Sequence, residues 1–160
     1  SCTLTVHFAP TTTSAFIDSF DIPSDDPDEP SVTVNVSSTG DTTVPDILVT
    51  DGFDPATDLQ LTFLTTTMGG TANGSIAIYN NSGTANLLIG TIGGVNGLSA
   101  PFSIQNDGCS NQSLVPHGIC TVSLQFAPTT AGTFNDSFDI PSNDPDESTV
   151  TFNVSGTSNP

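Results

Sequence analysis

The 160-residue sequence predicts an all-β sandwich, and three of its features carry that prediction. Apolar and polar residues alternate with a period of two over short runs, as they do in strands that bury one face. Turn-forming Gly, Asn, Asp and Pro residues separate these runs, and no run keeps the period of a helix. Thr and Val, which favour half-buried pleated surfaces, dominate the runs. The apolar content of 34% is sufficient for one core of the β type.

The sequence repeats itself after 118 residues. Residues 1–40 align without a gap to residues 119–158, and 25 of the 38 positions from Cys2 to Thr39 are identical. The acidic decapeptide FDIPSDDPDE at 20–29 returns in this way as FDIPSNDPDE at 138–147. We therefore expect residues 1–40 to be the C-terminal part of one module, or strands exchanged with a neighbouring chain. Residues 41–158 are expected to form a complete module, in a tandem repeat with a 118-residue period.

Eight strands are expected in the complete module, namely residues 44–50, 59–65, 74–80, 85–93, 101–106, 120–128, 133–141 and 149–156. Alternation predicts which side chains of three strands face inward: Leu59, Leu61 and Phe63; Val122, Leu124 and Phe126; Val150, Phe152 and Val154. Eight short strands joined by tight turns over such a length are typical of an immunoglobulin-like sandwich.

The charge is one-sided, with 17 acidic residues, no Lys or Arg and a formal net charge of −17. Because phosphate binding depends on Lys and Arg, we expect no nucleic-acid partner, and anionic lipid is disfavoured for the same reason. No apolar run reaches the 18 residues of a membrane span, so no membrane insertion is expected. Such charge needs screening by cations or salt. It favours an extracellular or cell-surface location, with a salt-adapted acidic surface as the alternative.

Three cysteines are present, an odd number. Cys109 and Cys120 flank the turn-rich loop CSNQSLVPHGIC, and their spacing permits a disulfide that would contribute roughly 2–3 kcal/mol of stability. Cys2 aligns with Cys120, so its equivalent partner would precede residue 1. We expect Cys2 to be unpaired within its truncated repeat, or paired with another chain.

The segment from PFSIQNDGC to NVSGT resembles the Hydin-like (ASH) immunoglobulin-like domains and the choice-of-anchor D repeats of bacterial surface proteins. That family pattern combines a Cys–Cys pair, an F-A-P-t strand end, a G-x-f strand start, an S-N-D-P turn and a terminal G-T. These features stand here in order at Cys109, Cys120, 126–129, 132–134, 142–145 and 156–157. The first copy departs from the pattern where TTTSAF lacks the Gly of TTAGTF and SST replaces SGT. The resemblance implies a repeat domain of stalks, scaffolds and filaments.

Acidic loops are candidates for binding Ca²⁺, because carboxylate and amide oxygens are its preferred ligands. The alternative is a structural turn, in which Asn and Asp side chains cap their own backbone and Pro fixes φ. No EF-hand spacing is present, and no other cofactor is required. The candidate ligands lie in the two decapeptides and in the loop TDGFDPATD at 50–58: Asp25, Asp26, Asp28, Glu29, Asn143, Asp144, Asp146, Glu147, Asp51, Asp54 and Asp58.

Catalytic sites are not predicted. The acidic residues cluster on turns, whereas a glycosidase needs two carboxyl groups facing each other across a cleft. His7 aligns with Gln125, and His117 lies in the loop between the paired cysteines, so too few ligands remain for zinc. Six Asn-x-Ser sequons are candidate glycosylation sites: Asn35, Asn73, Asn80, Asn111, Asn135 and Asn153.

Two functions are consistent with these observations. The first is a structural part of an extracellular stalk or filament, in which each module contacts its own neighbours, through tandem repeats or through β-strand addition between subunits. The second is an adhesive module that binds carbohydrate or protein at the cell surface. Glycan-binding sites usually present aromatic platforms, and this chain has one Tyr, Tyr79, and no Trp. The structural function is therefore preferred.

Overall fold

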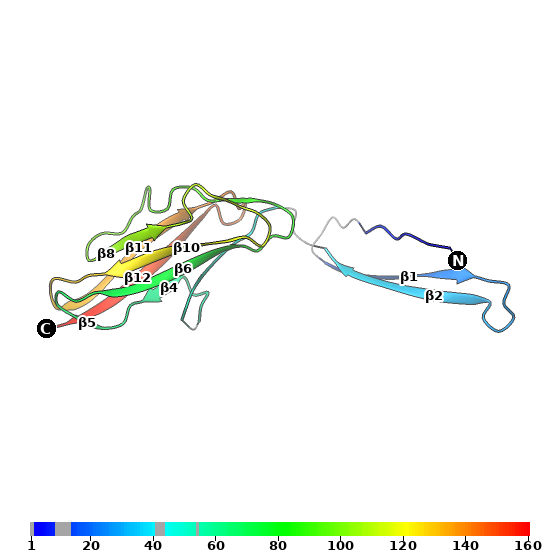
Figure 1. The fold of residues 1–160 in the computed structure, drawn as a ribbon, viewed down its shortest axis with the longest axis horizontal. Coiled ribbons are helices and arrows are strands. Elements are labelled where there is room, and N and C mark those ends of the chain that lie inside the picture. Colours follow the sequence, from blue (N-terminus) through cyan, green and yellow to red (C-terminus); the bar gives the residue numbers. More distant parts are fainter. Residues whose placement is uncertain (1, 9–13, 41–43, 54) are drawn as a thin grey trace. The chain divides into compact units, whose positions relative to one another are not determined.

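The computed structural model describes residues 2–8, 14–40, 44–53 and 55–160 of the chain. Within these ranges the regular elements are all β-strands, and no helix has the length and apolar character that crossing a bilayer requires. The chain divides into two compact units, residues 1–42 and residues 43–160, which are called unit 1 and unit 2 below (Figure 1). The predicted all-β fold is confirmed.

Unit 1 contains one antiparallel hairpin. Strand β1 (Ala15–Pro23) pairs with β2 (Ser31–Thr39) from Ala15 opposite Thr39 to Pro23 opposite Ser31. The remainder of the acidic decapeptide forms the connecting turn, which closes with a hydrogen bond from the Ser24 N–H to the Pro30 carbonyl at 3.0 Å. Alternating Phe, Ile and Val residues thus form strands, while the run of Asp and Pro between them forms the turn.

The first sheet of unit 2 is antiparallel throughout and has the order β3-β6-β10-β8. Its strands are β3 (Ile47–Asp51), β6 (Ala72–Asn80), β10 (Ile119–Phe126) and β8 (Phe102–Asp107). The register between β10 and β8 shifts between Ser123 and Leu124, where Gln105 of β8 has no opposite residue.

The second sheet of unit 2 has the order β11-β12-β4. Strand β11 (Gly132–Pro141) forms an antiparallel hairpin with β12 (Thr149–Asn159). The short strands β4 (Gln60–Thr62) and β5 (Thr66–Thr67) both pair with β12 in parallel. A separate small ladder joins β7 (Leu87–Leu88) to β9 (Ser113–Leu114).

The two hairpins have the same register. Adding 118 to each residue of the β1–β2 ladder gives the β11–β12 ladder from Thr133 opposite Thr157 to Pro141 opposite Thr149. The turn bond is also repeated, from the Ser142 N–H to the Ser148 carbonyl at 2.9 Å. The sequence repeat is therefore a repeat of local structure.

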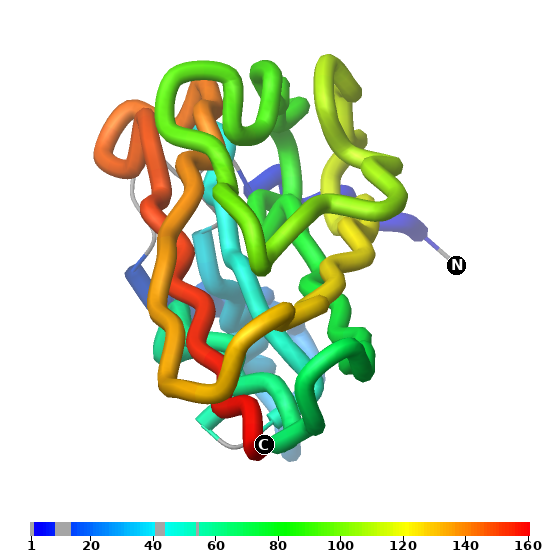
Figure 2. The backbone as a smooth tube through the Cα atoms, turned by 90° about the vertical axis from the view of Figure 1, so that its left-hand side faces the viewer, coloured from blue at the N-terminus to red at the C-terminus, as the bar shows by residue number. Residues whose placement is uncertain are grey.

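The core of unit 2 lies between its two sheets. In Figure 2 the orange and red strands β11 and β12 stand on one side, and the yellow and green strands β10 and β6 on the other. Four rings, Phe63, Phe102, Phe126 and Phe134, form a chain of contacts with centroids 5.0–5.9 Å apart. The inward residues predicted for the strands at 120–128 and 149–156 are at most 6% exposed, and Leu61 and Phe63 are also buried. Those predictions are confirmed.

The segment 85–93 differs from its prediction as a strand. Only Leu87 and Leu88 form a ladder, because the following backbone is divided between two partners. The Ile89 N–H donates to the Gln112 carbonyl, whereas the Gly90 N–H donates to the Pro141 carbonyl and the Gly93 N–H to the Asp139 carbonyl. Leu87, Ile89 and Ile92 are nevertheless buried, so the alternating pattern indicated burial correctly without a regular strand.

Candidate functional site

The disulfide joins Cys109 and Cys120, with Cα atoms 5.3 Å apart. It fixes the loop between β8 and β10. The Asp107 carboxylate supports this loop by accepting hydrogen bonds from the Cys109 N–H at 2.9 Å and the Ser110 N–H at 2.8 Å. Partial desolvation acts to raise the pKa of Asp107, but the hydrogen bonds from Ser110 and Cys109 outweigh it and hold the pKa below its ordinary value. Cys2 is free and exposed.

The second decapeptide forms a turn that is anchored by Asp144. One carboxylate oxygen accepts the N–H groups of Asp146 at 3.1 Å and Glu147 at 3.3 Å, which shapes the turn itself. The other accepts the Ile47 N–H at 2.8 Å, at the start of β3. Asp144 is only 2% exposed, and its hydrogen bond from Ile47 joins the β11–β12 hairpin to the opposite sheet.

These contacts set the ionisation of the turn. Burial acts to raise the pKa of Asp144, but the hydrogen bonds from Ile47, Asp146 and Glu147 outweigh it and lower the pKa. The hydrogen bond with Asp144 and the repulsion of its negative charge raise the pKa of Asp146. The pKa values of two carboxyl groups in one turn thus shift in opposite directions. N–H donors lower the pKa of Asp144, and the negative charge of Asp144 raises the pKa of Asp146.

The first decapeptide forms the same turn, but among the described residues Asp25 and Asp26 make no hydrogen bonds like those of Asn143 and Asp144 to distant segments. The Asp28 N–H donates to Asp26 at 3.0 Å, as the Asp146 N–H does to Asp144. The Asp26 N–H donates to the Ser24 hydroxyl at 3.2 Å. Asp25, Asp26, Asp28 and Glu29 are all exposed. The sequence of the turn is therefore sufficient for its local hydrogen bonds.

The loop at 50–58 presents two carboxylates within the described residues. Asp51 is buried, with one oxygen accepting the Phe53 N–H at 3.0 Å and the other without a hydrogen-bond partner among the described residues. Asp58 caps the start of β4 through the Gln60 N–H. Asp54 lies outside the described residues. Within the described part of the chain, no group of three or more His, Cys, Asp or Glu side chains is placed to hold a metal ion. Calcium binding stays a prediction.

The histidines and sequons lie in varied environments. His7 and His117 are exposed, and His117 has a positive φ of 59° in the disulfide loop. Five sequon asparagines, Asn35, Asn73, Asn111, Asn135 and Asn153, are exposed. Asn80 is instead 1% exposed, and its side-chain NH₂ group donates to the carbonyls of Ala85 and Leu114. A glycan on Asn80 would displace both bonds, whereas the glycosylation of the other five stays a prediction.

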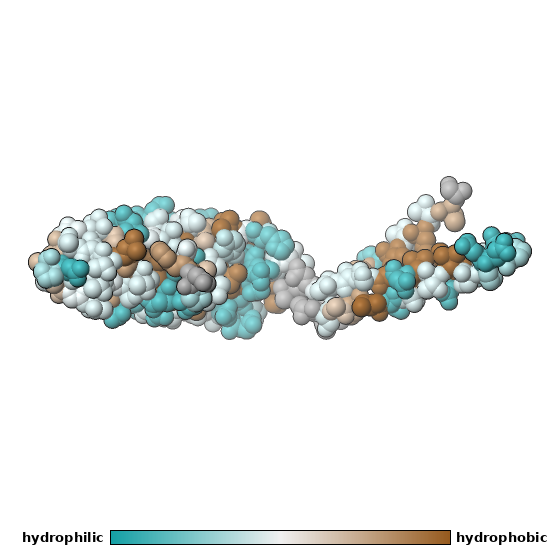
Figure 3. Space-filling view, turned by 90° about the horizontal axis from the view of Figure 1, so that it is seen from below, coloured by the Kyte–Doolittle hydropathy of each residue, from teal (hydrophilic) through white to brown (hydrophobic). Residues whose placement is uncertain are grey.

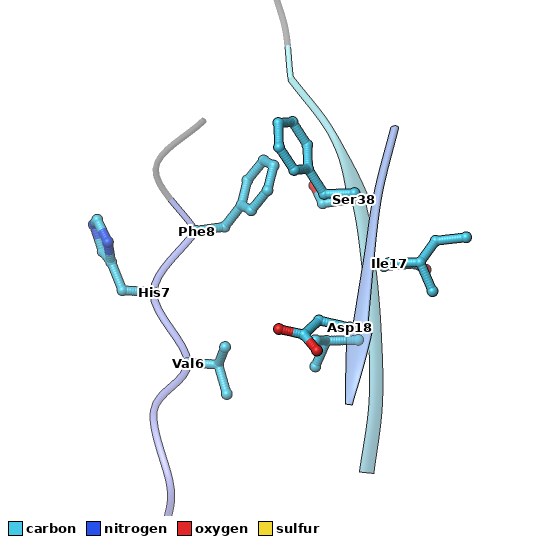
Figure 4. Close-up of a pocket in the computed structure, with 9 residues that line it drawn as sticks. Val6, His7, Phe8, Ile17, Asp18 and Ser38 are labelled. Carbon is cyan, nitrogen blue, oxygen red and sulfur yellow. The ribbon is translucent and has the colours of Figure 1, made fainter. Parts of the chain in front are cut away.

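Unit 1 presents an apolar face that we call the open face. Figure 3 shows brown, apolar side chains along unit 1, whereas the visible surface of unit 2 is mostly teal and white. Within unit 1, residues 6–8 lie beside the hairpin and line a groove together with β1 and β2. Figure 4 shows Val6 and Phe8 pointing toward the hairpin, and His7 and Ile17 pointing away. The open face consists of Val6, Phe8, Phe16, Phe20, Ile22, Val32, Val34 and Val36.

The chain resembles proteins of known structure in its fold. No protein-family model matches the sequence, and no curated protein matches it. An ASH/PapD-like domain of human CEP192 superposes with a TM-score of 0.51 at 20% identity, covering 78% of this chain and 92% of that chain. A protein of unknown function from Porphyromonas gingivalis W83 superposes with a TM-score of 0.54 at 11% identity, covering 93% of this chain and 68% of that chain.

The fold is an immunoglobulin-like β-sandwich. A third similar structure, the VesB protease of Vibrio cholerae, has a TM-score of 0.54 at 16% identity. The match covers 69% of this chain but 31% of the protease, so it concerns the fold of one part of that enzyme. The sandwich provides a scaffold, and function must be argued from the surfaces that it presents.

Two residues of this immunoglobulin-like sandwich have roles that the sequence did not reveal. The sequence predicts an ion ligand or a local cap at Asp144, but this residue also holds the start of β3, 97 residues away. The sequence predicts only a glycan acceptor at Asn80, but this residue organises the 80–85 turn, where its side-chain carbonyl also accepts the Ser82 N–H at 3.1 Å. Both roles depend on contacts between distant segments, for which no local motif exists.

Proposed function

We propose that the chain is a structural segment of an extracellular stalk or filament built from immunoglobulin-like modules. The observation that carries this proposal is the hairpin that recurs after 118 residues with the same register and the same turn bonds. Repeated modules contact their neighbours and stack into a semi-rigid rod that sets spacing and transmits tension. The natural partners are then further modules of the same kind, as in the choice-of-anchor D repeats that the sequence resembles.

The surface chemistry supports an exposed location. A disulfide persists in oxidising compartments, and the Cys109–Cys120 bond is of this structural kind. A chain with no Lys or Arg has no site for trypsin-like proteases. Its charge of −17 also disfavours non-specific adhesion to anionic surfaces. These features suit a protein that spaces other components outside a cell.

The test is to image the native material and to measure the mass of its subunit. Filaments or stalks are expected. A subunit of about 160 residues would indicate exchange between chains, and a chain of several 118-residue periods would indicate a covalent array. Native material that consists of single, unassembled modules inside cells would contradict the proposal.

Ca²⁺ belongs to this proposal as a ligand of the acidic turns. The first decapeptide has one more carboxylate than the second, because Asp25 replaces Asn143, and its side chains are exposed. Ca²⁺ is expected to bind more tightly there. A chelator such as EDTA should lower the melting temperature of the protein, and an unchanged melting temperature would remove the ion from the proposal.

A further inference from the structure

The open face of unit 1 has a covered counterpart within the same chain. Phe138, Ile140 and Val150, the equivalents of Phe20, Ile22 and Val32, are at most 6% exposed. In unit 1, by contrast, Ile22 is 44% and Val32 is 47% exposed. The side chains are identical at all three positions, so the difference lies in what covers them. In unit 2 these side chains face the sheet β3-β6-β10-β8. Residues 44–118 hold β3, β6 and β8 of that sheet, whereas β10 corresponds to the first residues of unit 1.

Polar contacts fix how residues 44–118 sit on the second hairpin. The Asp136 carboxylate accepts the Ser99 N–H at 2.7 Å. Asp144 accepts the Ile47 N–H at 2.8 Å, and the Asn143 side-chain oxygen accepts the Leu88 N–H at 2.7 Å. Each of the three acceptors has an equivalent on the first hairpin that can accept the same bond: Asp18, Asp26 and Asp25.

Cys2 gives a third, independent correspondence. Its equivalent, Cys120, is bonded to Cys109, which belongs to the covering segment 44–118. Cys2 itself is free and exposed. A segment that covered the open face as 44–118 covers the second hairpin would bring a cysteine to Cys2.

We propose that the open face binds a half-sandwich of the kind formed by residues 44–118, supplied by another module of the assembly. The interface buries the apolar side chains of unit 1, and the backbone N–H groups of the half-sandwich bind Asp18, Asp25 and Asp26. This inference rests on the proposed modular assembly and names the surface through which modules are completed.

A second copy of this chain fits the open face less well. Two open faces packed together would bring Asp18 and Asp26 of both copies into one interface, and the chain has no Lys or Arg to neutralise them.

One substitution between the hairpins sets the specificity of the interface. Asn143 donates from its side-chain nitrogen to the Asn86 carbonyl at 3.3 Å, and a carboxylate at Asp25 has no proton for that bond. The segment 44–118 therefore fits the second hairpin better than the first, which limits exchange between modules.

The experiment extends the full chain. A second copy of residues 44–118 is fused directly before Ser1, where the repeat would place it. Hydrogen exchange at the amides of residues 15–39 should slow by on the order of 100-fold or more relative to the unfused chain. Unit 2 of the same molecule is the internal control, since its exchange should not change.

Disulfide formation gives a second readout. With oxidised glutathione present, Cys2 and the added copy of Cys109 each lose a thiol proton and form one S–S bond. The glutathione disulfide takes up the two electrons and leaves as two thiols. Mass mapping of peptic peptides identifies the pair. Exchange that stays as fast as in the unfused chain, with Cys2 still free, would overturn the proposal.

Matched variants test the face and the partner. Phe20→Asp in the fusion should abolish the protection, whereas Ile17→Asn on the opposite face, where unit 2 has Asn135, should retain it. Asp25→Asn should increase the protection further. A stoichiometric dimer of the unfused chain that Phe20→Asp disrupts would overturn the choice of partner. The fusion measures completion in solution, so its failure is distinguishable from an absence of filaments in native material.

Discussion

The β1–β2 and β11–β12 hairpins have nearly the same sequence and the same register but opposite surroundings. Local bonds are reproduced in detail: the Thr33 hydroxyl donates to Asp21 at 2.6 Å, and the Thr151 hydroxyl donates to Asp139 at 2.8 Å. Burial is not reproduced, because Phe138 is fully buried while Phe20 is only half-buried. The comparison separates what a strand sequence specifies from what its packing partner adds.

The largest difference is expected for truncation of the equivalent phenylalanines. Phe138→Ala should cost about 3–5 kcal/mol, because it leaves a cavity in the core of unit 2. Phe20→Ala should cost less than about 1 kcal/mol, since the ring already contacts solvent. Residue-resolved hydrogen exchange in denaturant measures each unit separately. Equal losses would show that the hairpin of unit 1 is covered in solution.

The equivalent cysteines provide the next comparison. Replacing Cys109 and Cys120 together by Ser should destabilise unit 2 by roughly 2–3 kcal/mol, because the unfolded chain regains the freedom of the 11-residue loop. Cys2→Ser should have no measurable effect on either unit. Urea unfolding followed by the same exchange method tests both. A loss of stability in Cys2→Ser would mean that Cys2 already has a partner.

The acidic turns should differ by a smaller amount. Asp144→Ala should cost about 1–3 kcal/mol, because the buried N–H of Ile47 loses its acceptor. Asp26→Ala removes only contacts within an exposed turn and should cost much less. Unfolding of the two single variants provides the measurement. Similar costs would contradict the role of Asp144 in joining the two sheets.

The smallest effect concerns acid stability. The pKa of Asp144 is lowered in the folded state, so its carboxylate contributes stability above the ordinary Asp pKa of about 3.9. That contribution is lost as pH falls through the lower, folded-state pKa. Asp144→Asn should therefore flatten the fall in the melting temperature of unit 2 below about pH 4. A melting temperature that falls as steeply below about pH 4 in Asp144→Asn as in the unchanged protein would contradict this role of Asp144.

The sequence by itself determined the all-β class and the inward-facing side chains of β10 and β12. These features depend on alternation and turn chemistry, which act between neighbouring residues. The Cys109–Cys120 pair was accessible in the same way, from its short spacing. The division into modules of a 118-residue repeat stays a prediction. The prediction of a strand over 85–93 was wrong for most of that segment. Alternating apolar residues indicate which side chains are buried, but a strand also needs a neighbouring strand that pairs with it in register.

Tertiary structure alone decided the functions of Asp144 and Asn80 and the difference between the two hairpins. The Asp144–Ile47 bond spans 97 residues, and the Asn80–Leu114 bond spans 34. No local pattern encodes such contacts, because they depend on which segments the sandwich brings together. The same reason explains the open face: strands of nearly the same sequence form ladders of the same register, but their burial depends on a second layer that belongs to another part of the chain.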